Sequence, residues 1–500
     1  MKNRLYIIIA ALAGAFTLSS CSDWLDVSPK TNVPAEELFE TENGYMSALA
    51  GIYISMTGEN IYGKNLTFGL MEQLAQMYDK LPDGTNDRGS VYIYNQQTSG
   101  GFNTKSALEN MWQSQYNLIA NTNNLLKWLD KNGEAVLVEE NMYDMIRGEA
   151  LALRAFLHFD ILRGWGPMNY AGNADARNTK CIPYRTVTDA SKQPLLTAEE
   201  IVGKIINDLL QAKNHLSYEA TLDLSAYESI GRRYRLNYHA VNALLARVYN
   251  YAGEYSDART CAIEVIENCG LELQSGNDND PILTNEVIFG INMYELKDNL
   301  SDYFAVGEKL TTKYYLNIST LNTIFESVGS ESEDMRAKGS AFYRNNEQQN
   351  AISLKYIDND NEIIPLIRIP EMYYIACEAA EYSAESATYV NLVRNKRGIS
   401  KAKDVTCDTP EQRTTALNKE YRKEFYGEGQ YFWFLKTHGV TGTLAHCTDV
   451  TLAEENFIFP LPDAELEYGW TEENDTADNN EENTREDEQT GNEGVIIPRI

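Results

Sequence analysis

Hydrophobic side chains recur with the spacing of an α-helix along most of the chain. Residues 142–163 are apolar on nearly every side, which is typical of a helix buried between neighbours. A further helix is predicted over residues 198–216, because Thr197 and Glu200 have the spacing of a capping box. Between residues 106 and 130 one face carries Leu108, Met111, Trp112, Leu118, Ile119, Leu125, Leu126 and Leu129. The pattern therefore predicts a mainly α fold.

Residues 236–269 are predicted to form a pair of helices of the tetratricopeptide type. The residues that recur at the spacing of that motif are Ala246, Tyr249, Gly253, Tyr255 and Ala258. Small alanines let two helices approach closely, and a glycine permits the turn between them. Residues 372–397 show the same spacing of small residues more weakly. We expect tetratricopeptide-like helix pairs in an α–α superhelix, embedded in a larger fold with long loops and a few short β-strands.

Strand signals are few. Residues 91–94 and 287–291 are short and β-rich, and residues 355–357 are expected to pair with 363–364 across an acidic turn. Long polar segments, predicted to be loops, cover residues 57–104, 168–196, 270–310 and 328–350. Loops on a rigid helical scaffold are where ligands bind.

The first residues have the pattern of an export signal. Lys2 and Arg4 precede twelve uncharged residues, a stretch too short to span a membrane. A run of small residues then ends in Cys21, which looks like a bacterial lipobox. We expect residues 1–20 to be a lipoprotein signal peptide and Cys21 to carry a lipid that anchors the chain to a membrane.

Composition narrows the classes of partner. The chain has 500 residues, 43% of them hydrophobic, which is enough for a sizeable core. Its net charge of −30 argues against nucleic acid and against a polybasic membrane patch. Residues 471–500 form an acidic tail that is predicted to be disordered. These numbers do not separate an enzyme from a binding protein.

Catalytic signatures are missing from the sequence. There is no HExxH, P-loop or GxSxG motif, and no CxxC pair that would suggest a zinc ribbon. Glu420, Glu424 and Glu428 have a spacing that could serve a glycosidase, but interleaved basic residues favour a charged helix face. Residues 358–362 alternate like a calcium loop but lack its glycine, and Cys377 is predicted to be a small core residue.

Several segments match one family in shared order. They are residues 21–29, 37–39, 48–53, 147–156, 164–167, 235–251, 367–374, 397–398, 428–429 and 459–462. Together they resemble the SusD/RagB family of surface glycan-binding lipoproteins, over roughly residues 21–469. The chain departs from the family pattern at Glu420-Tyr421-Arg422 and at residues 431–435, which would alter packing without abolishing the fold.

The resemblance implies a binding protein without a cofactor or bound metal, and not an enzyme. Such proteins capture oligosaccharide at the cell surface and deliver it to a SusC-like TonB-dependent transporter in the outer membrane. It also implies an N-terminal part over residues 21–280 and a C-terminal part over residues 281–470. Three alternatives stay open, namely a lid that captures peptides, a surface glycosidase, and a helical scaffold without a small ligand.

Sugars stack their apolar C–H faces on aromatic rings, while polar side chains bind their hydroxyl groups. Aromatic residues in the predicted loops, with polar residues beside them, are therefore the candidate ligand-binding residues. They are Tyr62, Asn65, Tyr78, Asp79, Asn86, Tyr92, Tyr94, Tyr294 and Tyr303.

Overall fold

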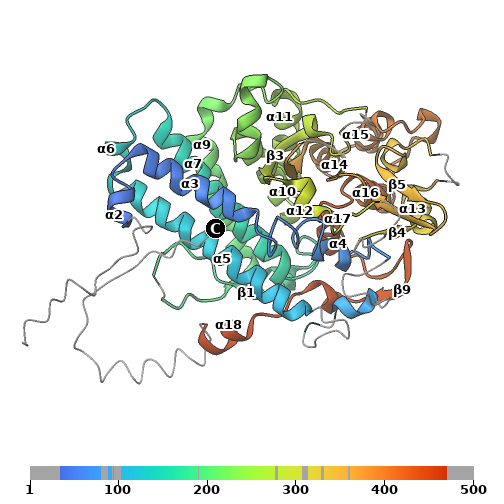
Figure 1. The fold of residues 1–500 in the computed structure, drawn as a ribbon, viewed down its shortest axis with the longest axis horizontal. Helices are drawn as coiled ribbons and strands as arrows, with labels where there is room; N and C mark the ends of the chain where they lie inside the picture. The colour runs from blue at the N-terminus through green and yellow to red at the C-terminus, as the bar shows by residue number, and fades with distance from the viewer. Residues whose placement is uncertain are drawn as a thin grey trace, which may run out of the picture.

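The computed structural model describes residues 34–79, 88–92, 94, 103–189, 191–275, 280–306, 314–327, 332–357 and 361–469. Within them the protein is mainly α, as the sequence predicts (Figure 1). The α-helices are α2 (Ala35–Leu38), α3 (Glu42–Met56), α4 (Leu70–Leu74), α5 (Thr104–Trp128), α6 (Glu134–Val136), α7 (Met142–Trp165), α8 (Ala174–Arg177), α9 (Ala198–His215), α10 (Tyr238–Ala252), α11 (Tyr255–Asn268), α12 (Leu296–Leu300), α13 (Ile318–Phe325), α14 (Ile369–Glu378), α15 (Ser383–Lys396), α16 (Pro410–Glu424), α17 (Gln430–Thr437) and α18 (Asp463–Tyr468). No helix in these ranges is long and apolar enough to cross a membrane.

Short strands pair in four small antiparallel sheets within the described ranges. The pairs are β1 (Lys180–Ile182) with β2 (Leu196–Thr197), β3 (Val287–Asn292) with β7 (Ile363–Arg368), and β8 (Gly442–Leu444) with β9 (Cys447–Leu452). In the fourth sheet β6 (Asn350–Ser353) lies between β4 (Leu316–Asn317) and β5 (Phe342–Asn345). The expected strand at residues 287–291 is confirmed as β3.

Two strand predictions are wrong. Residues 88–92 form a 3₁₀ helix, η2, where a strand was expected to begin. The hairpin across the acidic turn does not form either, because β7 pairs with β3, with Ile291 opposite Ile364, while residues 355–357 form a turn. A β-rich pattern of four residues does not specify its partner, and here the partner of β7 lies more than 70 residues earlier.

The helices α3, α5, α7 and α9 pack together on one side of the molecule. Because α7 is apolar all round, it is enclosed, and Phe156 and Phe159 are 1% or less exposed. The capping box that starts α9 is present: the Glu200 N–H donates to Thr197 Oγ1 at 3.2 Å, and the Thr197 N–H donates to Glu200 Oε2 at 2.8 Å.

The predicted helix pair over residues 236–269 is confirmed as α10 and α11. Gly253 makes the turn between them with φ of 79°, and a Cβ there would lie 3.0 Å from the Ala171 Cβ. The weaker repeat is the pair α14 and α15, and α11 packs against α14. One buried core extends from Phe39 to Phe459 through both halves of the chain, and the division at residue 280 stays a prediction.

Candidate ligand-binding surface

Three tyrosine rings stack between the core and the surface near α12. The Tyr78 and Tyr314 rings lie 4.5 Å apart at 16°, and the Tyr314 and Tyr303 rings lie 5.5 Å apart at 14°. The Tyr78 hydroxyl donates to the Phe68 carbonyl at 2.7 Å. The Tyr314 N–H donates to the Tyr303 carbonyl at 2.9 Å, so the backbone also joins these segments. We call Tyr78, Tyr314 and Tyr303 the tyrosine stack.

The outer end of the stack carries an ion pair. Lys64 Nζ lies 2.6 Å from Glu59 Oε2, donates to the Tyr303 hydroxyl at 3.3 Å, and sits 5.4 Å from the centre of that ring. Burial lowers the pKa of Lys64, but the hydrogen bond and charge of Glu59 outweigh burial and raise it above its usual value. The Lys64 ammonium is therefore charged and fixed beside a half-buried aromatic ring.

Tyr294 and Tyr303 stand at the two ends of α12. Tyr294 lies two residues before this five-residue helix, which is about 7.5 Å long, and Tyr303 lies three residues after it. Tyr294 is 73% exposed and Tyr303 is half-buried. We call Glu59, Lys64, Tyr294 and Tyr303 the tyrosine platform. The two charged members were not predicted from the sequence, because a single Glu and Lys in a long polar loop carry no distinguishing pattern.

Three of the predicted binding residues lie in the core. Tyr62 is 2% exposed and its hydroxyl donates to Asp160 Oδ2 at 2.8 Å. Asn65 is 7% exposed and Tyr78 is 1% exposed. The loop over residues 57–69 folds inward, which corrects the expectation that its aromatic side chains face solvent. Of the three, Tyr78 packs on Tyr314 within the tyrosine stack, and none of them presents a surface to a ligand.

Three other predicted residues use their polar atoms within the protein. The Tyr92 hydroxyl donates to the Leu74 carbonyl, and the Tyr94 hydroxyl donates to the Asn456 carbonyl at 2.6 Å. Asp79 Oδ2 accepts the Asn317 N–H at 2.5 Å. Asn86 and the lipidation residue Cys21 lie outside the described residues.

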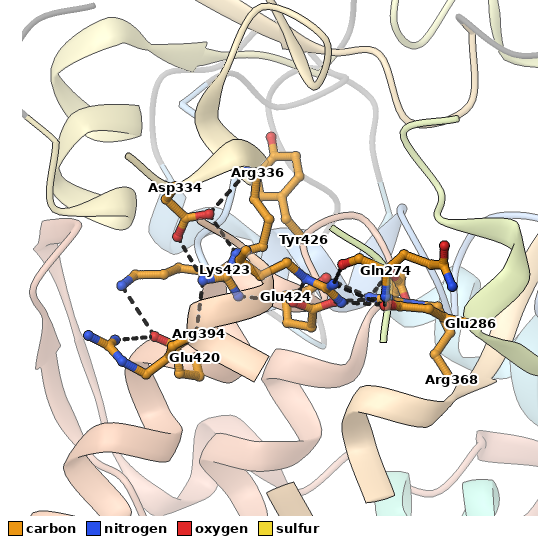
Figure 2. Close-up of polar contacts among 12 residues, drawn as sticks. Gln274, Glu286, Asp334, Arg336, Arg368, Arg394, Glu420, Lys423, Glu424 and Tyr426 are labelled. Atoms are coloured by element: carbon orange, nitrogen blue, oxygen red, sulfur yellow. Dashed lines mark hydrogen bonds and ion pairs between the residues drawn. The ribbon is translucent and has the colours of Figure 1, made fainter. Parts of the chain in front are cut away.

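Glu420 and Glu424 of α16, and Glu428 in the turn after it, are buried, so the charged helix face predicted from the sequence does not face solvent here. Figure 2 shows Glu420 and Glu424 among basic side chains. Glu424 Oε1 accepts from Arg368 and Arg397 at 2.8 and 2.7 Å, and its Oε2 accepts from Arg336 at 2.9 Å. The partners come from distant segments, which is why the sequence pattern missed them. We call the following residues the buried ion cluster: Glu286, Asp334, Arg336, Arg368, Arg394, Arg397, Glu420, Lys423, Glu424 and Glu428.

The ion cluster is not suited to glycoside hydrolysis. Burial raises the pKa of Glu420, but Arg336, Lys423 and Arg394 outweigh burial and lower it to about 2. A general acid needs the opposite shift. The cavity beside Arg336, Lys423 and Tyr426 has a volume of only ≈ 50 Å³, far below the roughly 300–1,000 Å³ of typical ligand pockets. In the described ranges no group of three or more His, Cys, Asp or Glu side chains is placed to hold a metal ion.

Comparison with protein families identifies the chain. Residues 23–250 match the family described as "Starch-binding associating with outer membrane", of the SusD-like type. Residues 291–494 match the SusD family, also termed SusD_RagB. The chain belongs to the SusD/RagB family. The two matches lie in the order expected from the sequence motifs and include most of the chain.

Individual relatives of this SusD/RagB chain are distant. SusD-like protein P2 of Formosa agariphila is 27% identical over 275 residues, which are 53% of this chain and 46% of that protein. A SusD-like protein of Bacteroides ovatus is 24% identical, over 55% of this chain and 46% of its own. The matched region thus spans about half the length of these curated relatives.

Solved structures confirm the fold. A SusD superfamily protein from Bacteroides thetaiotaomicron has a TM-score of 0.66 at 20% identity, covering 86% of this chain and 98% of that chain. A structure described as a SusD-like carbohydrate binding protein, from Bacteroides vulgatus, has a TM-score of 0.66 at 17% identity, with coverage of 85% and 96%. At these identities the likeness establishes the tetratricopeptide-like helical fold.

Proposed function

We propose that this protein is a cell-surface lipoprotein that captures oligosaccharide on the tyrosine platform and delivers it to a SusC-like TonB-dependent transporter. The observation that carries the proposal is the Tyr303 ring, braced from behind by Tyr314 and flanked by the Glu59–Lys64 pair. The family described as starch-binding and the carbohydrate-binding description of the Bacteroides vulgatus structure support a glycan rather than another ligand.

The geometry suits a sugar for two reasons. A ring that is already held by stacking loses little conformational freedom when a ligand binds, so more of the contact energy appears as affinity. The Glu59 carboxylate accepts hydrogen bonds from sugar hydroxyls and the Lys64 ammonium donates to them.

Replacing Tyr303 by Ala tests the site. Glycan and peptide arrays probed with the wild-type protein identify a ligand, and calorimetry with that ligand compares the variants. Stacking on one aromatic ring contributes about 1–2 kcal/mol, so Tyr303→Ala should weaken binding roughly 5- to 30-fold. Tyr382→Ala is the matched control, since Tyr382 is 70% exposed on the turn between α14 and α15.

The arrays also separate the two candidate ligands. Binding to peptides but to no glycan would favour a peptide-capturing lid, because a tyrosine next to an ion pair also suits a peptide. Equal loss of affinity in Tyr303→Ala and Tyr382→Ala, or no loss in either, would place the site elsewhere. Release of reducing sugar by the purified wild-type protein would favour a glycosidase instead.

The anchor and the transporter need separate tests. Cys21→Ala should move the protein from the membrane fraction to the soluble fraction, because a protein without acyl chains loses about 0.8 kcal/mol for each buried CH₂. Membrane retention of that variant would contradict the lipid anchor. Affinity purification of the wild-type protein from solubilised membranes should recover a β-barrel transporter, and its absence would contradict the proposed partner.

A further inference from the structure

Two buried cysteines from separate segments meet beside α15. Cys377 lies in the last turn of α14 and is 0% exposed, while Cys407 lies in the loop before α16 and is 1% exposed. Cys377 Sγ is 3.3 Å from the Ser386 hydroxyl of α15, and that hydroxyl donates to the Cys377 carbonyl at 2.7 Å. The two thiols also interact with each other, since their contact raises the pKa of Cys377 and lowers the pKa of Cys407.

Backbone contacts fix both cysteines in this arrangement. On the Cys407 side, Asn391 of α15 exchanges two hydrogen bonds with the Val405 backbone, at 2.9 and 3.0 Å. On the Cys377 side, Arg413 in the first turns of α16 donates to the Glu378 carbonyl at 2.5 Å. The residues next to each cysteine are therefore tied to the same region of α15 and α16, which holds the two cysteines near each other.

We propose that Cys377 and Cys407 form a disulfide bond in the exported protein. A protein that associates with the outer membrane leaves the cytoplasm, where thiols are kept reduced, and enters a compartment where disulfides persist. The proposal is independent of the ligand, because neither cysteine belongs to the tyrosine platform.

Formation of the Cys377–Cys407 bond needs an oxidant, and a thiol oxidase that itself carries a disulfide can serve as one. One cysteine thiolate attacks the oxidant's disulfide and forms a mixed disulfide, and the other thiolate then displaces the oxidant as a dithiol. The two thiols lose two protons and two electrons, and the electrons reduce the oxidant. Both thiols are buried after folding, so the exchange takes place before α15 and α16 close over them.

The remaining described cysteines provide internal controls. Cys261 and Cys269 lie eight positions apart on and just after α11, about 12 Å along a helix, and burial raises the pKa of each thiol to about 11. Cys181 and Cys447 are buried on other elements and lie next to Leu196 and Gln76 respectively. None of these four thiols should be oxidised.

Peptide mapping of the exported full-length protein tests the bond. The membrane fraction is denatured without reductant in the presence of iodoacetamide, which alkylates free thiols, and is then digested and analysed by mass spectrometry. We expect the peptides that contain Cys377 and Cys407 to be joined, about 2 Da lighter than the sum of the free thiol forms. Cys181, Cys261, Cys269 and Cys447 should all be alkylated. Alkylation of both Cys377 and Cys407, or linkage of either to another cysteine, would overturn the proposal.

Two further measurements do not depend on the folding of a variant. Reductant should lower the melting temperature of the wild-type protein by about 4 °C, because the bond closes a loop of roughly 30 residues. The protein expressed in the cytoplasm without its signal should show Cys377, Cys407 and the four control cysteines all alkylated. A linked pair in that reduced sample, or an unchanged melting temperature of the linked protein on reduction, would contradict the role assigned to the bond. Glycan binding is measured separately, so its failure leaves this result unaffected.

Discussion

Replacing Glu424 by Gln should destabilise the protein, because it leaves three buried guanidinium groups short of an anion. Glu424 is 3% exposed and accepts from Arg336, Arg368 and Arg397 at 2.7–2.9 Å. Glutamine keeps the shape of the side chain, but it has no charge and turns an N–H₂ donor toward other donors. The variant therefore tests charge pairing with little change in packing volume.

The magnitude follows from burial. Removing one partner of a buried ion pair costs about 3–5 kcal/mol, since the remaining charges stay desolvated. The entropy of unfolding is about 2.1 cal/mol/K for each residue, so roughly 400 ordered residues give a total of about 0.8 kcal/mol/K. We therefore expect the melting temperature to fall by about 4–6 °C.

Thermal melts followed by circular dichroism at pH 7 measure the effect. The matched control is Glu333→Gln, because Glu333 pairs with Lys403 at 3.1 Å and both side chains are exposed, by 48% and 62% respectively. Exposed pairs contribute about 0–1 kcal/mol, so the control should melt within about 1 °C of the wild type. Equal shifts in the two variants would refute the argument from burial.

The pH dependence supplies a second check on Glu424. Burial raises the pKa of this carboxyl, but Arg397 and Arg368 outweigh burial and hold it well below its usual value. A depressed folded-state pKa gives stability that is present above the ordinary pKa of 4.5 and is lost as the pH falls through the folded value. The stability difference between wild type and Glu424→Gln should be constant from pH 6 to pH 8 and shrink in strong acid. A difference that grows on acidification would contradict the ionised state.

Three further substitutions probe other parts of the fold. Burial raises the pKa of Glu72 to about 8, so between pH 4.5 and pH 8 the folded protein holds a proton that the unfolded chain has released. This contribution to the stability of the wild type should therefore fall as the pH rises from about 4.5 to about 8 and level off above that. In thermal melts Glu72→Gln should match the wild type at pH 4 and exceed it at pH 9. Thr197→Ala removes the N-cap of α9 and should lower the free energy of unfolding, measured by chemical denaturation, by about 1 kcal/mol. Thr260→Ala on the exposed face of α11 is the control and should leave that free energy nearly unchanged. Gly253→Ala places a Cβ at φ of 79° and should lower the free energy of unfolding by about 1–2 kcal/mol. Gly203→Ala in the middle of α9, where a Cβ meets nothing within 4 Å, should instead raise the free energy of unfolding by up to about 1 kcal/mol.

The helices could be predicted because their signals are local. The apolar run of α7, the cap at Thr197 and the glycine at position 253 each act within a few residues, and the structure confirms all three. The order of short motifs predicted the family for the same reason. Each motif is read within a window of about ten residues and needs no knowledge of what it packs against.

The burial of charge and of the loop tyrosines could not be predicted in that way. Glu424 is separated from Arg336 by 88 residues and from Arg368 by 56, and Tyr62 from its partner Asp160 by 98. A charged helix face and a polar loop look the same in sequence whether they meet solvent or a distant partner. The list of candidate binding tyrosines therefore became shorter, with Tyr294 and Tyr303 left, only after the fold showed which rings remain accessible.

Burial also changes the meaning of the net charge. Among the described residues, eleven carboxylates and ten cations are buried, and Glu72, with a pKa of about 8, is protonated at neutral pH. The charges buried among the described residues thus nearly cancel, and nearly all of the net −30 belongs to the other residues of the chain. A negative surface repels uronate and sulfate groups over about 10 Å at 0.1 M salt but leaves a neutral sugar unaffected. At the platform the positive charge of Lys64 is already balanced by Glu59, so it does little to offset the repulsion between the negative surface and an anionic polysaccharide. The proposed glycan is therefore a neutral one, and a uronate oligosaccharide should bind more weakly than its neutral counterpart of equal length, most clearly at low salt.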